Sequence, residues 1–509
     1  MFSSINTVSL SGLDGTIVEV QTDISNGIVA FDIIGLPDAT VREARERAKA
    51  SIKNCGLQYP SKRITMNLAP ASLKKEGSGF DLAITLALLS ASGQVQIEDS
   101  EHTVFLGELA LDGSVKPIQG VLPMVITAYE QGMKRCFVPF DNAEEAAVID
   151  GIDIYPLKTL SEAVEHFDGR QQIARYALDR GTLFTAHTSS LLDMRDVKGQ
   201  EQAKRAMEIA ASGSHNMLMS GPAGTGKSML AKRMSTILPD MTFDEMLEVT
   251  KLHSIAGILP ERVPLITERP FRSPHHTVSA NALSGGGAMP RPGELSLAHC
   301  GVLFLDELPE FKRDALEVLR QPLEDRIITI SRVNATLSYP CNIMLVAAMN
   351  PCPCGNYGNP KRACTCTPNQ IQRYRAKISG PLLDRIDIQV EIPHVRYNDL
   401  SHEGSGDTSA VIRERVNRAR RIQLERYEKD GITSNAELTA PMLDKYCALG
   451  DAENKLLQSA FDRLGLSARA HSKILKVART IADIEGFDDI KTSHIAEAIQ
   501  YRSLDRKGF

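Results

Sequence analysis

One segment combines glycines, a lysine and a serine at the spacing of a phosphate-binding loop. Residues 216–234 read NMLMSGPAGTGKSMLAKRM, with a G-x-x-x-x-G-K-S motif after an apolar strand and before a helix. The glycines let backbone N–H groups cradle phosphates, Lys227 would reach the β- and γ-phosphates, and Ser228 would ligate Mg²⁺. The predicted ATP-binding residues are Gly221, Pro222, Ala223, Gly224, Thr225, Gly226, Lys227, Ser228 and Met229.

Two further apolar strands end in polar side chains that suit hydrolysis of the bound nucleotide. In GVLFLDELPEF, Asp306 would complete the Mg²⁺ shell and Glu307 would polarise the attacking water. In IMLVAAMN, the amide of Asn350 would orient that water from a neighbouring strand end. The catalytic set predicted so far is Lys227, Glu307 and Asn350.

Two arginines stand where a guanidinium could meet phosphate charge. Arg385 follows SGPLLD at a predicted helix end, from which it would reach the γ-phosphate held by a neighbouring subunit. Arg469 stands near the start of the helix predicted in SARAHSKILKVARTIADIEG and is a second phosphate-sensing candidate. The alternatives are a surface ion pair for Arg385 and a helix cap or salt bridge for Arg469.

Four of the nine cysteines lie in CPCGNYGNPKRACTC, residues 352–366. Four thiolates can surround Zn²⁺ tetrahedrally, so Cys352, Cys354, Cys364 and Cys366 are predicted to hold a structural zinc with no open coordination position. A redox-active cluster and free thiols are the alternatives. The adjacent His275 and His276 are interpreted as a histidine pair in a loop and not as metal ligands.

The elements that must position these residues require more than one domain, because a 509-residue chain exceeds what a single core supports. Short strand and helix patterns alternate over residues 1–168, a weakly periodic linker follows at 169–190, and a second α/β pattern covers 191–396. A connecting loop and basic helix are expected at 397–434, and a compact helical region at 435–509.

Composition excludes few functions. The chain is 42% hydrophobic and 24% charged, with a net charge of −5, which is ordinary for a globular protein and neutral on nucleic-acid binding. It has neither an apolar run long enough to span a membrane nor a recognisable signal peptide. A cytoplasmic location with no membrane partner is therefore expected.

Longer strings around these motifs carry a family resemblance. RPFRSPHHTVS, LSGGG, PRPGELSLAHCGVLFLDELPEF, MNPCPCG and LLDRIDIQVE resemble the magnesium-chelatase-like AAA+ ATPases of the YifB/ComM type. The resemblance implies a parallel-sheet P-loop module with a C-terminal helical lid. It implies a homo-hexameric ring with ATP sites between subunits. MRDVKGQEQAKRAMEIAASG resembles the segment that packs on adenine in AAA+ proteins, with Val197 and Gly199 as the contacts.

The same resemblance implies action on DNA, as a branch-migration helicase in recombination or natural transformation. The alternative is a magnesium-chelatase-type remodelling ATPase that acts on a protein partner or in metal insertion. Arg272, in the segment after the phosphate loop, and Arg332, in the predicted hairpin IITISRVNATLSYP, are the candidate DNA contacts. The basic helix 411–426 is interpreted as either a solvated inter-domain helix or a DNA contact.

The N-terminal region resembles the α/β domain of Lon proteases, through NLAPASLKKEGSGFDLAITLAL. Aligning KEGSGFD on the protease motif puts Gly79 at the nucleophile position, with Ser78 one residue early. The partner lysine falls at Leu122. Neither member of the Ser–Lys dyad is present, so proteolysis is not expected, and assembly or DNA contact is the predicted role of this domain.

Overall fold

The structure is a computed structural model that describes residues 1–178, 192–260, 263–287, 290–332, 335–359, 362–394 and 406–502. The chain divides into two compact units, one of residues 1–187 and 246–267, the other of residues 188–245 and 268–509. Segment 246–267, which the sequence places in the ATPase core, therefore groups with the N-terminal unit. Among the described helices, none is both long and apolar enough to cross a membrane.

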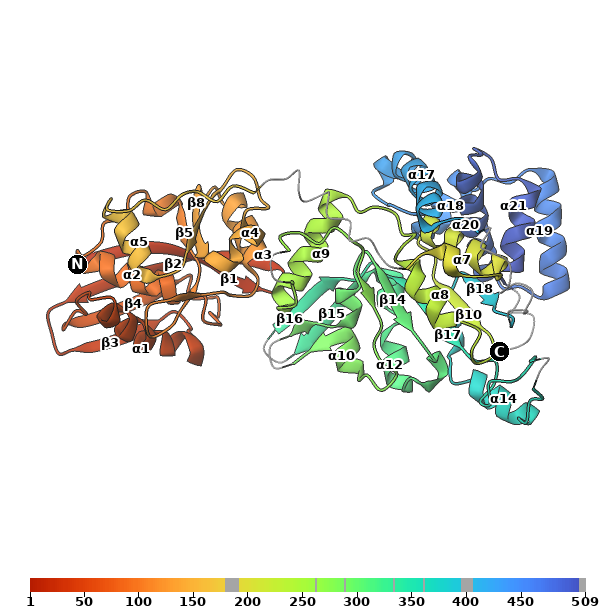
Figure 1. The fold of residues 1–509 in the computed structure, drawn as a ribbon, viewed down its shortest axis with the longest axis horizontal. Helices are drawn as coiled ribbons and strands as arrows, with labels where there is room; N and C mark the ends of the chain where they lie inside the picture. Colours follow the sequence, from red (N-terminus) through yellow and green to blue (C-terminus); the bar gives the residue numbers. More distant parts are fainter. Residues whose placement is uncertain are drawn as a thin grey trace. The chain divides into compact units, whose positions relative to one another are not determined.

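A mixed seven-stranded sheet forms the centre of the first unit, in the order β3-β4-β2-β1-β5-β8-β9 (Figure 1). β2 pairs antiparallel with both β1 and β4, and the other neighbours pair in parallel. The strands are β1 (Phe2–Ser11), β2 (Asp14–Ser25), β3 (Ala30–Ile34), β4 (Arg63–Ala69), β5 (Thr103–Phe105), β8 (Arg135–Pro139) and β9 (Asp153–Leu157), with a small separate pair, β6 (Glu108–Leu109) and β7 (Val115–Lys116).

Helices cover both faces of this sheet. Successive residues of a strand point to opposite faces, so each face contributes side chains to its own buried cluster. Val104 and Cys136 belong to one buried cluster, whereas their neighbours Phe105 and Phe137 belong to the other. The first cluster includes residues of α3 (Val121–Glu130) and α4 (Ala143–Ala146). The second includes residues of α1 (Ala39–Asn54), α2 (Asp81–Ala91) and α5 (Leu160–Phe167). Most of α9 (Phe243–Ala256) also falls in this unit.

The Lon-like motif keeps its helix in the structure, and its serine bonds to a carboxylate. The Ser78 hydroxyl donates to Glu108, and Glu108 lies opposite Lys116 in the β6–β7 pair. Gly79 and Leu122 occupy the positions that the alignment gives to the nucleophile and its lysine, and Leu122 is fully buried. The absence of proteolysis stays a prediction.

The second unit contains a five-stranded parallel sheet in the order β11-β14-β17-β10-β18. This confirms the predicted parallel-sheet α/β fold. Every residue of the three central strands is buried, as expected for a parallel sheet covered on both faces. The strands are β10 (Met217–Ser220), β11 (Phe271–Arg272), β14 (Val302–Leu305), β17 (Met344–Met349) and β18 (Ile388–Glu391).

Short helices and two hairpins complete the part of this unit before residue 394. The hairpins are β12 (Gly285–Gly286) with β13 (Arg291–Pro292), and β15 (Ile327–Arg332) with β16 (Ala335–Pro340). The helices are α7 (Glu201–Gly213), α8 (Lys227–Met234), α10 (Ala280–Ser284), α11 (Glu294–Leu297), α12 (Arg313–Val318), α13 (Pro322–Asp325), α14 (Pro368–Arg375) and α15 (Gly380–Leu383).

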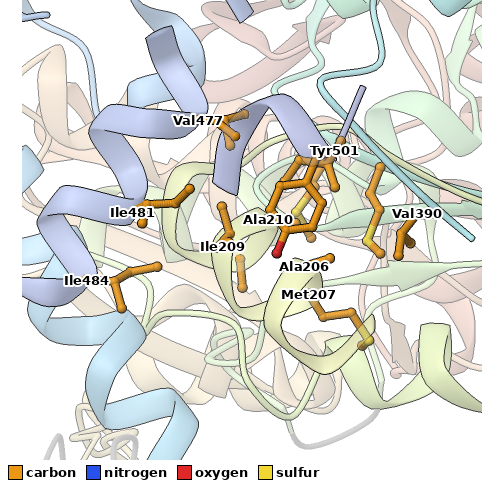
Figure 2. Packing of buried hydrophobic residues seen from close by; sticks show 14 of the residues in the cluster. Ala206, Met207, Ile209, Ala210, Val390, Val477, Ile481, Ile484 and Tyr501 are labelled. Carbon is orange, nitrogen blue, oxygen red and sulfur yellow. The ribbon is translucent and has the colours of Figure 1, made fainter. Parts of the chain in front are cut away.

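The C-terminal helices share one hydrophobic core with the sheet (Figure 2). Ile481 of α20 and Tyr501 belong to the same buried cluster as Ile209 of α7 and Val390 of β18. The backbone N–H of Gln389 in β18 also donates to Tyr501 O at 2.8 Å. These helices are therefore integral to the second unit; they are α17 (Ser409–Tyr427), α18 (Ala440–Tyr446), α19 (Asp451–Leu464), α20 (Ala468–Glu485) and α21 (Thr492–Gln500).

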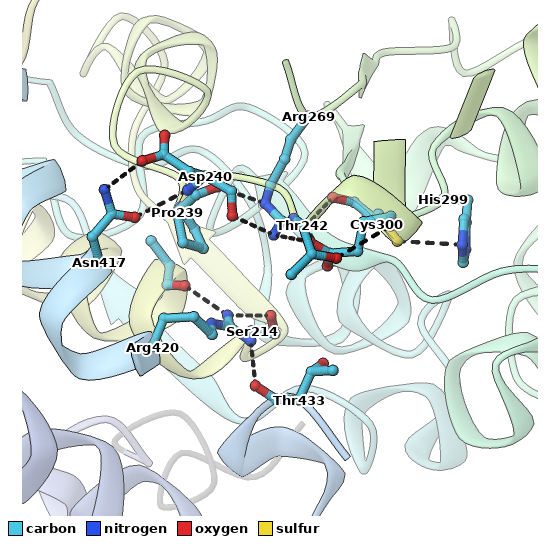
Figure 3. A network of polar contacts seen from close by, with 12 residues as sticks. Ser214, Pro239, Asp240, Thr242, Arg269, His299, Cys300, Asn417, Arg420 and Thr433 are labelled. Carbon is cyan, nitrogen blue, oxygen red and sulfur yellow. Dashed lines mark hydrogen bonds and ion pairs between the residues drawn. The ribbon is translucent and has the colours of Figure 1, made fainter. Parts of the chain in front are cut away.

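Two arginines of the basic helix α17, Arg420 and Arg426, bind partners within the same unit, and Figure 3 shows the contacts of Arg420. Arg420 is 8% exposed and donates to Thr433 O at 3.0 Å and to Ser214 Oγ at 2.7 Å. Burial and the nearby Arg269 lower the pKa of Arg420 to about 10. Arg426 pairs with the buried Asp483 at 2.7 Å. Arg420 and Arg426 are therefore bound within the second unit, so at these two positions the helix is neither a solvated inter-domain helix nor a DNA contact.

Candidate nucleotide site

The phosphate loop runs from the end of β10 to the start of α8, as the motif requires. Gly224 and Gly226 adopt φ of +78° and +87°, a region in which side chains with a Cβ are strained. A Cβ on Gly221 would lie 2.3 Å from Ile392 O, so only glycine fits there. α8 begins at Lys227, and its N-terminus therefore faces the loop with unpaired N–H groups that suit an anion.

Lys227 lies within the loop that it is predicted to serve. Its Nζ donates to Gly221 O at 2.7 Å, to Pro222 O at 2.9 Å and to Asn350 Oδ1 at 3.2 Å. Burial lowers the pKa of Lys227, while the nearby Asp306 and Glu307 oppose that shift. Phosphate oxygens would replace these neutral acceptors with negative charge and strengthen the contact.

Ser228 and Asp306 form the predicted magnesium pair. Ser228 Oγ donates to Asp306 Oδ2 at 2.5 Å. Adjacent ligand oxygens of an octahedral Mg²⁺ lie about 3 Å apart, since each oxygen is about 2.1 Å from the ion. The two oxygens would have to move apart only slightly, from 2.5 Å to about 3 Å, to bind the same ion. The chemistry of the donors, a hydroxyl and a carboxylate, suits Mg²⁺.

Glu307 and Asn350 lie at the ends of neighbouring strands, because β17 pairs with both β14 and β10 in parallel. A cavity of about 390 Å³ opens at this edge of the sheet. It is lined by Ala223, Gly224, Thr225, Gly226, Lys227, Ser228, Met229, Asp306, Glu307, Met349 and Asn350. The structure thus brings together the sequence-predicted phosphate, magnesium and water-activating residues.

The segment expected to pack on adenine lies against the phosphate loop. Val197 is buried, and Gly199 adopts φ of +65°. The next residue, Gln200, was not predicted, although its Nε2 donates to Thr225 O at 2.7 Å. Gln200 belongs to no motif in the sequence, so its hydrogen bond to the phosphate loop could be found only from the structure.

Arg385 and Arg469 lie together, away from the cavity around Lys227. Arg385 donates to Arg320 O at 2.6 Å and pairs with Glu324, and Arg469 pairs with Asp384 at 2.5 Å. Both line a cavity of about 590 Å³ that shares none of its lining residues with the phosphate-loop cavity. Neither arginine therefore lines the phosphate-loop cavity of its own chain.

The four predicted zinc ligands form one cluster. Their sulfur atoms all lie within 4.8 Å of one another. Cys352 Sγ is 3.4 Å from Cys354 Sγ and 3.7 Å from Cys364 Sγ, and the last two sulfurs are 3.6 Å apart. A tetrahedral zinc with Zn–S bonds of about 2.3 Å spaces its sulfurs about 3.8 Å apart, so the cluster fits the ion. Backbone hydrogen bonds of Asn356 and Thr365 lower the pKa of Cys354 to about 5, whereas the neighbouring thiols raise the pKa values of Cys364 and Cys366.

The two candidate DNA contacts differ in their surroundings. Arg272 makes a double hydrogen bond to Glu294, with both distances 2.7 Å, and this pairing raises its pKa. Arg332 lies in the exposed end of β15, where it donates to Asn281 Oδ1 at 3.2 Å. Arg332 is therefore the more accessible cation of the two. Arg269, from the same stretch as Arg272, is an internal anchor that pairs with Glu245 at 2.8 Å.

The fold and this site define a P-loop ATPase module of the AAA+ class, and comparison with known families supports that class. The family described as magnesium chelatase, subunit ChlI, matches residues 193–400. Its C-terminal region matches residues 406–502, and a further ChlI family matches residues 20–142 of the N-terminal unit.

The chain belongs to the ComM/YifB-like magnesium-chelatase family of ATPases. It is 42% identical over 500 residues to competence protein ComM of Haemophilus influenzae, covering 97% of this chain and 96% of that protein. It is 43% identical over 507 residues to protein YifB of Escherichia coli, covering 99% and 97%. Lon protease 2 of Bacillus subtilis is 26% identical over 169 residues, 30% of each chain, in the N-terminal region.

Proposed function

We propose that this chain is an ATP-driven motor that acts on DNA as a ring-forming branch-migration helicase in recombination or natural transformation. The observation that carries the motor is the convergence of Lys227, Ser228, Asp306, Glu307 and Asn350 on one cavity. The DNA part is supported by near full-length similarity to a protein named for competence. The exposed Arg332 at the end of β15 gives it a candidate phosphate contact.

In the proposed mechanism each residue of the cavity has one task. The loop N–H groups and Lys227 would hold the β- and γ-phosphates, and Ser228 and Asp306 would hold a Mg²⁺ that neutralises their charge. Glu307 accepts a hydrogen bond from the attacking water and draws off its proton, while the Asn350 amide orients the same water. Lys227 would exchange its present acceptors, Gly221 O, Pro222 O and Asn350 Oδ1, for phosphate oxygens when the nucleotide binds.

The proposed ring is supported by the position of two arginines outside the phosphate cavity. Arg385 and Arg469 line another cavity of the same unit. We propose that the subunits of a homo-hexamer make head-to-tail contacts in which the second cavity of one subunit meets the phosphate cavity of the next. Arg385 then supplies the arginine finger in trans and Arg469 senses the same nucleotide. In this arrangement the phosphate replaces Glu324 and Asp384 as the partner of each guanidinium.

Zinc has a structural role in this proposal. The cysteine cluster follows Asn350 directly, and a Cβ on Gly355 would lie 3.4 Å from the Cβ of Ala223 in the phosphate loop. A metal held by the four thiolates would fix the loop that follows β17 and Asn350 and that lies against the phosphate loop. Its four protein ligands leave no position for catalysis.

A magnesium-chelatase-type remodelling ATPase is the second candidate, and the matched family descriptions favour it. ATP hydrolysis measured with and without DNA distinguishes the two. Stimulation by DNA, together with movement of a four-way junction that Glu307→Gln abolishes, is the result expected of the DNA motor. Hydrolysis that DNA leaves unchanged contradicts the DNA motor and leaves action on a protein partner or in metal insertion.

A further inference from the structure

The segment around the cysteine cluster is basic, although the whole chain has a net charge of −5. Residues 351–383 contain five lysine or arginine residues and neither aspartate nor glutamate. Arg362 precedes Cys364 by two positions, and Arg373 lies in the last turn of α14. Both arginines are exposed, and neither has an ion pair within the part of the chain that the structure describes. Their positive charge is therefore available to an anionic partner.

The helix α14 presents most of its residues to solvent at the edge of the second unit (Figure 1). Tyr374 is the only buried residue of this eight-residue helix. Burial and the nearby Glu310 raise the pKa of Tyr374, while a backbone hydrogen bond of Asn350 opposes that shift. Lys377, just beyond the helix, pairs with Glu310 at 3.2 Å. These two side chains fix α14 to the residues that follow β14 and β17, and they leave Arg373 exposed.

An exposed aromatic ring lies beside this helix. Tyr357 is 47% exposed, and the guanidinium of Arg375 lies 5.6 Å from the centre of its ring. The backbone N–H of Tyr357 donates to Cys352 Sγ at 3.3 Å, so the cysteine cluster holds the loop that carries the ring. Unpaired bases stack on aromatic rings and on guanidinium planes. In a duplex each base face is covered by its neighbours, so this ring suits a single strand.

We propose that the aromatic ring and three arginines around the cysteine cluster bind single-stranded DNA; these residues are Tyr357, Arg362, Arg373 and Arg375. A base stacks on Tyr357 beside Arg375, and the neighbouring phosphates meet Arg362 and Arg373. None of these contacts reads a base edge, so the surface accepts any sequence. This inference rests on the proposed action on DNA and names the form of DNA that the second unit holds.

The test is binding of a fluorescein-labelled oligothymidylate to the full-length protein, measured by fluorescence anisotropy over a range of salt concentrations. Tyr357→Ala removes the stacking surface and should weaken binding about tenfold at fixed salt, with an unchanged salt dependence. Tyr357→Phe keeps the ring and should bind as the wild type does. Arg373→Ala should reduce the slope of log affinity against log salt by about 0.7, the value for one phosphate of a single strand. Arg373→Lys keeps the charge and should keep the slope.

Arg463→Ala is a matched control, because Arg463 is also an exposed arginine in the last turn of a helix, α19, and has no ion pair among the described residues. This variant should bind the oligothymidylate as the wild type does. A loss equal to that in Arg373→Ala would show a general effect of charge and overturn the assignment to this surface. Wild-type affinity in both Tyr357→Ala and Arg373→Ala overturns it too, as does a wild type that prefers duplex DNA to the single strand.

The same measurements separate this surface from the proposed motor. Binding that depends on Tyr357 and Arg373, in a protein whose ATP hydrolysis no DNA changes, supports the surface and contradicts the motor. A wild type that moves a four-way junction, with variants that bind the single strand equally well, supports the motor and overturns the surface. A wild type that does not bind the oligothymidylate overturns the proposal and leaves an acidic protein as the partner of this basic segment.

Discussion

Replacing Arg385 by alanine tests how the ring completes each nucleotide site. Arg385 lies with Arg469 in a cavity that shares no lining residue with the phosphate cavity. An arginine finger supplied by a neighbour contributes about 10³–10⁵-fold to hydrolysis. We therefore expect Arg385→Ala to bind ATP with unchanged affinity and to lose at least about 10³-fold in kcat. If Arg385 only pairs with Glu324, the change costs less than about 1 kcal/mol of stability and kcat survives.

Mixing two inactive proteins separates action in trans from action within one chain. Lys227→Ala lacks the phosphate contact but keeps Arg385, and Arg385→Ala has the reverse defect. In randomly assembled 1:1 rings, about one interface in four combines an intact phosphate loop with an intact finger. The mixture should recover about a quarter of wild-type hydrolysis when the rings exchange subunits. No recovery, in rings shown to be mixed by a labelled-subunit assay, refutes the trans assignment.

Three other changes probe the fold, the metal and the DNA contact. Burial opposes ionisation of Asp387, but Lys473 and the hydrogen bond from His215 outweigh it and hold the pKa of Asp387 below its usual range. Asp387→Asn leaves Lys473 without its partner at 3.5 Å and should lower the free energy of unfolding by about 3–5 kcal/mol, measured by urea titration at pH 7. In the wild type the Asp387 contribution is present above the unfolded pKa of about 3.9 and is lost as the pH falls further, so the difference between the two proteins should shrink in acid. Metal analysis should find zinc in the wild type and lose it in Cys354→Ser, and equal zinc in both proteins would contradict the cluster assignment. Arg332→Ala should weaken DNA binding equally for all sequences and reduce the slope of log affinity against log salt by about 0.9, while an unchanged slope would exclude Arg332 as a phosphate contact.

The nucleotide site was predictable because its residues are tied to strand ends. Lys227, Asp306 and Asn350 each follow a short apolar strand, and the carboxyl ends of parallel strands meet at one edge of the sheet. The four cysteines were predictable for a similar reason, since all lie within one short loop. In both cases the chemistry is local in the sequence or follows from a known motif.

Other features depend on contacts between residues far apart in the chain. His276 lies 3.7 Å from Glu307, although β11 ends at Arg272 and β14 at Leu305, so no strand pattern predicts this contact. Arg420 looks like an exposed cation in a basic helix, yet it is buried against Ser214, 206 positions earlier. Arg272 seemed available to DNA, but Glu294 occupies its guanidinium. The surroundings of all three residues depend on partners far away in the chain, and a single sequence does not show which distant residues meet.

The most direct test of the motor is ATP hydrolysis by the purified protein with single-stranded, duplex and four-way-junction DNA, beside the Glu307→Gln variant. The proposed mechanism predicts hydrolysis that branched DNA stimulates and that Glu307→Gln abolishes while ATP binding persists. Hydrolysis in Glu307→Gln equal to that of the wild type would contradict the assignment of the catalytic carboxylate. Wild-type hydrolysis that no DNA changes would contradict the DNA motor.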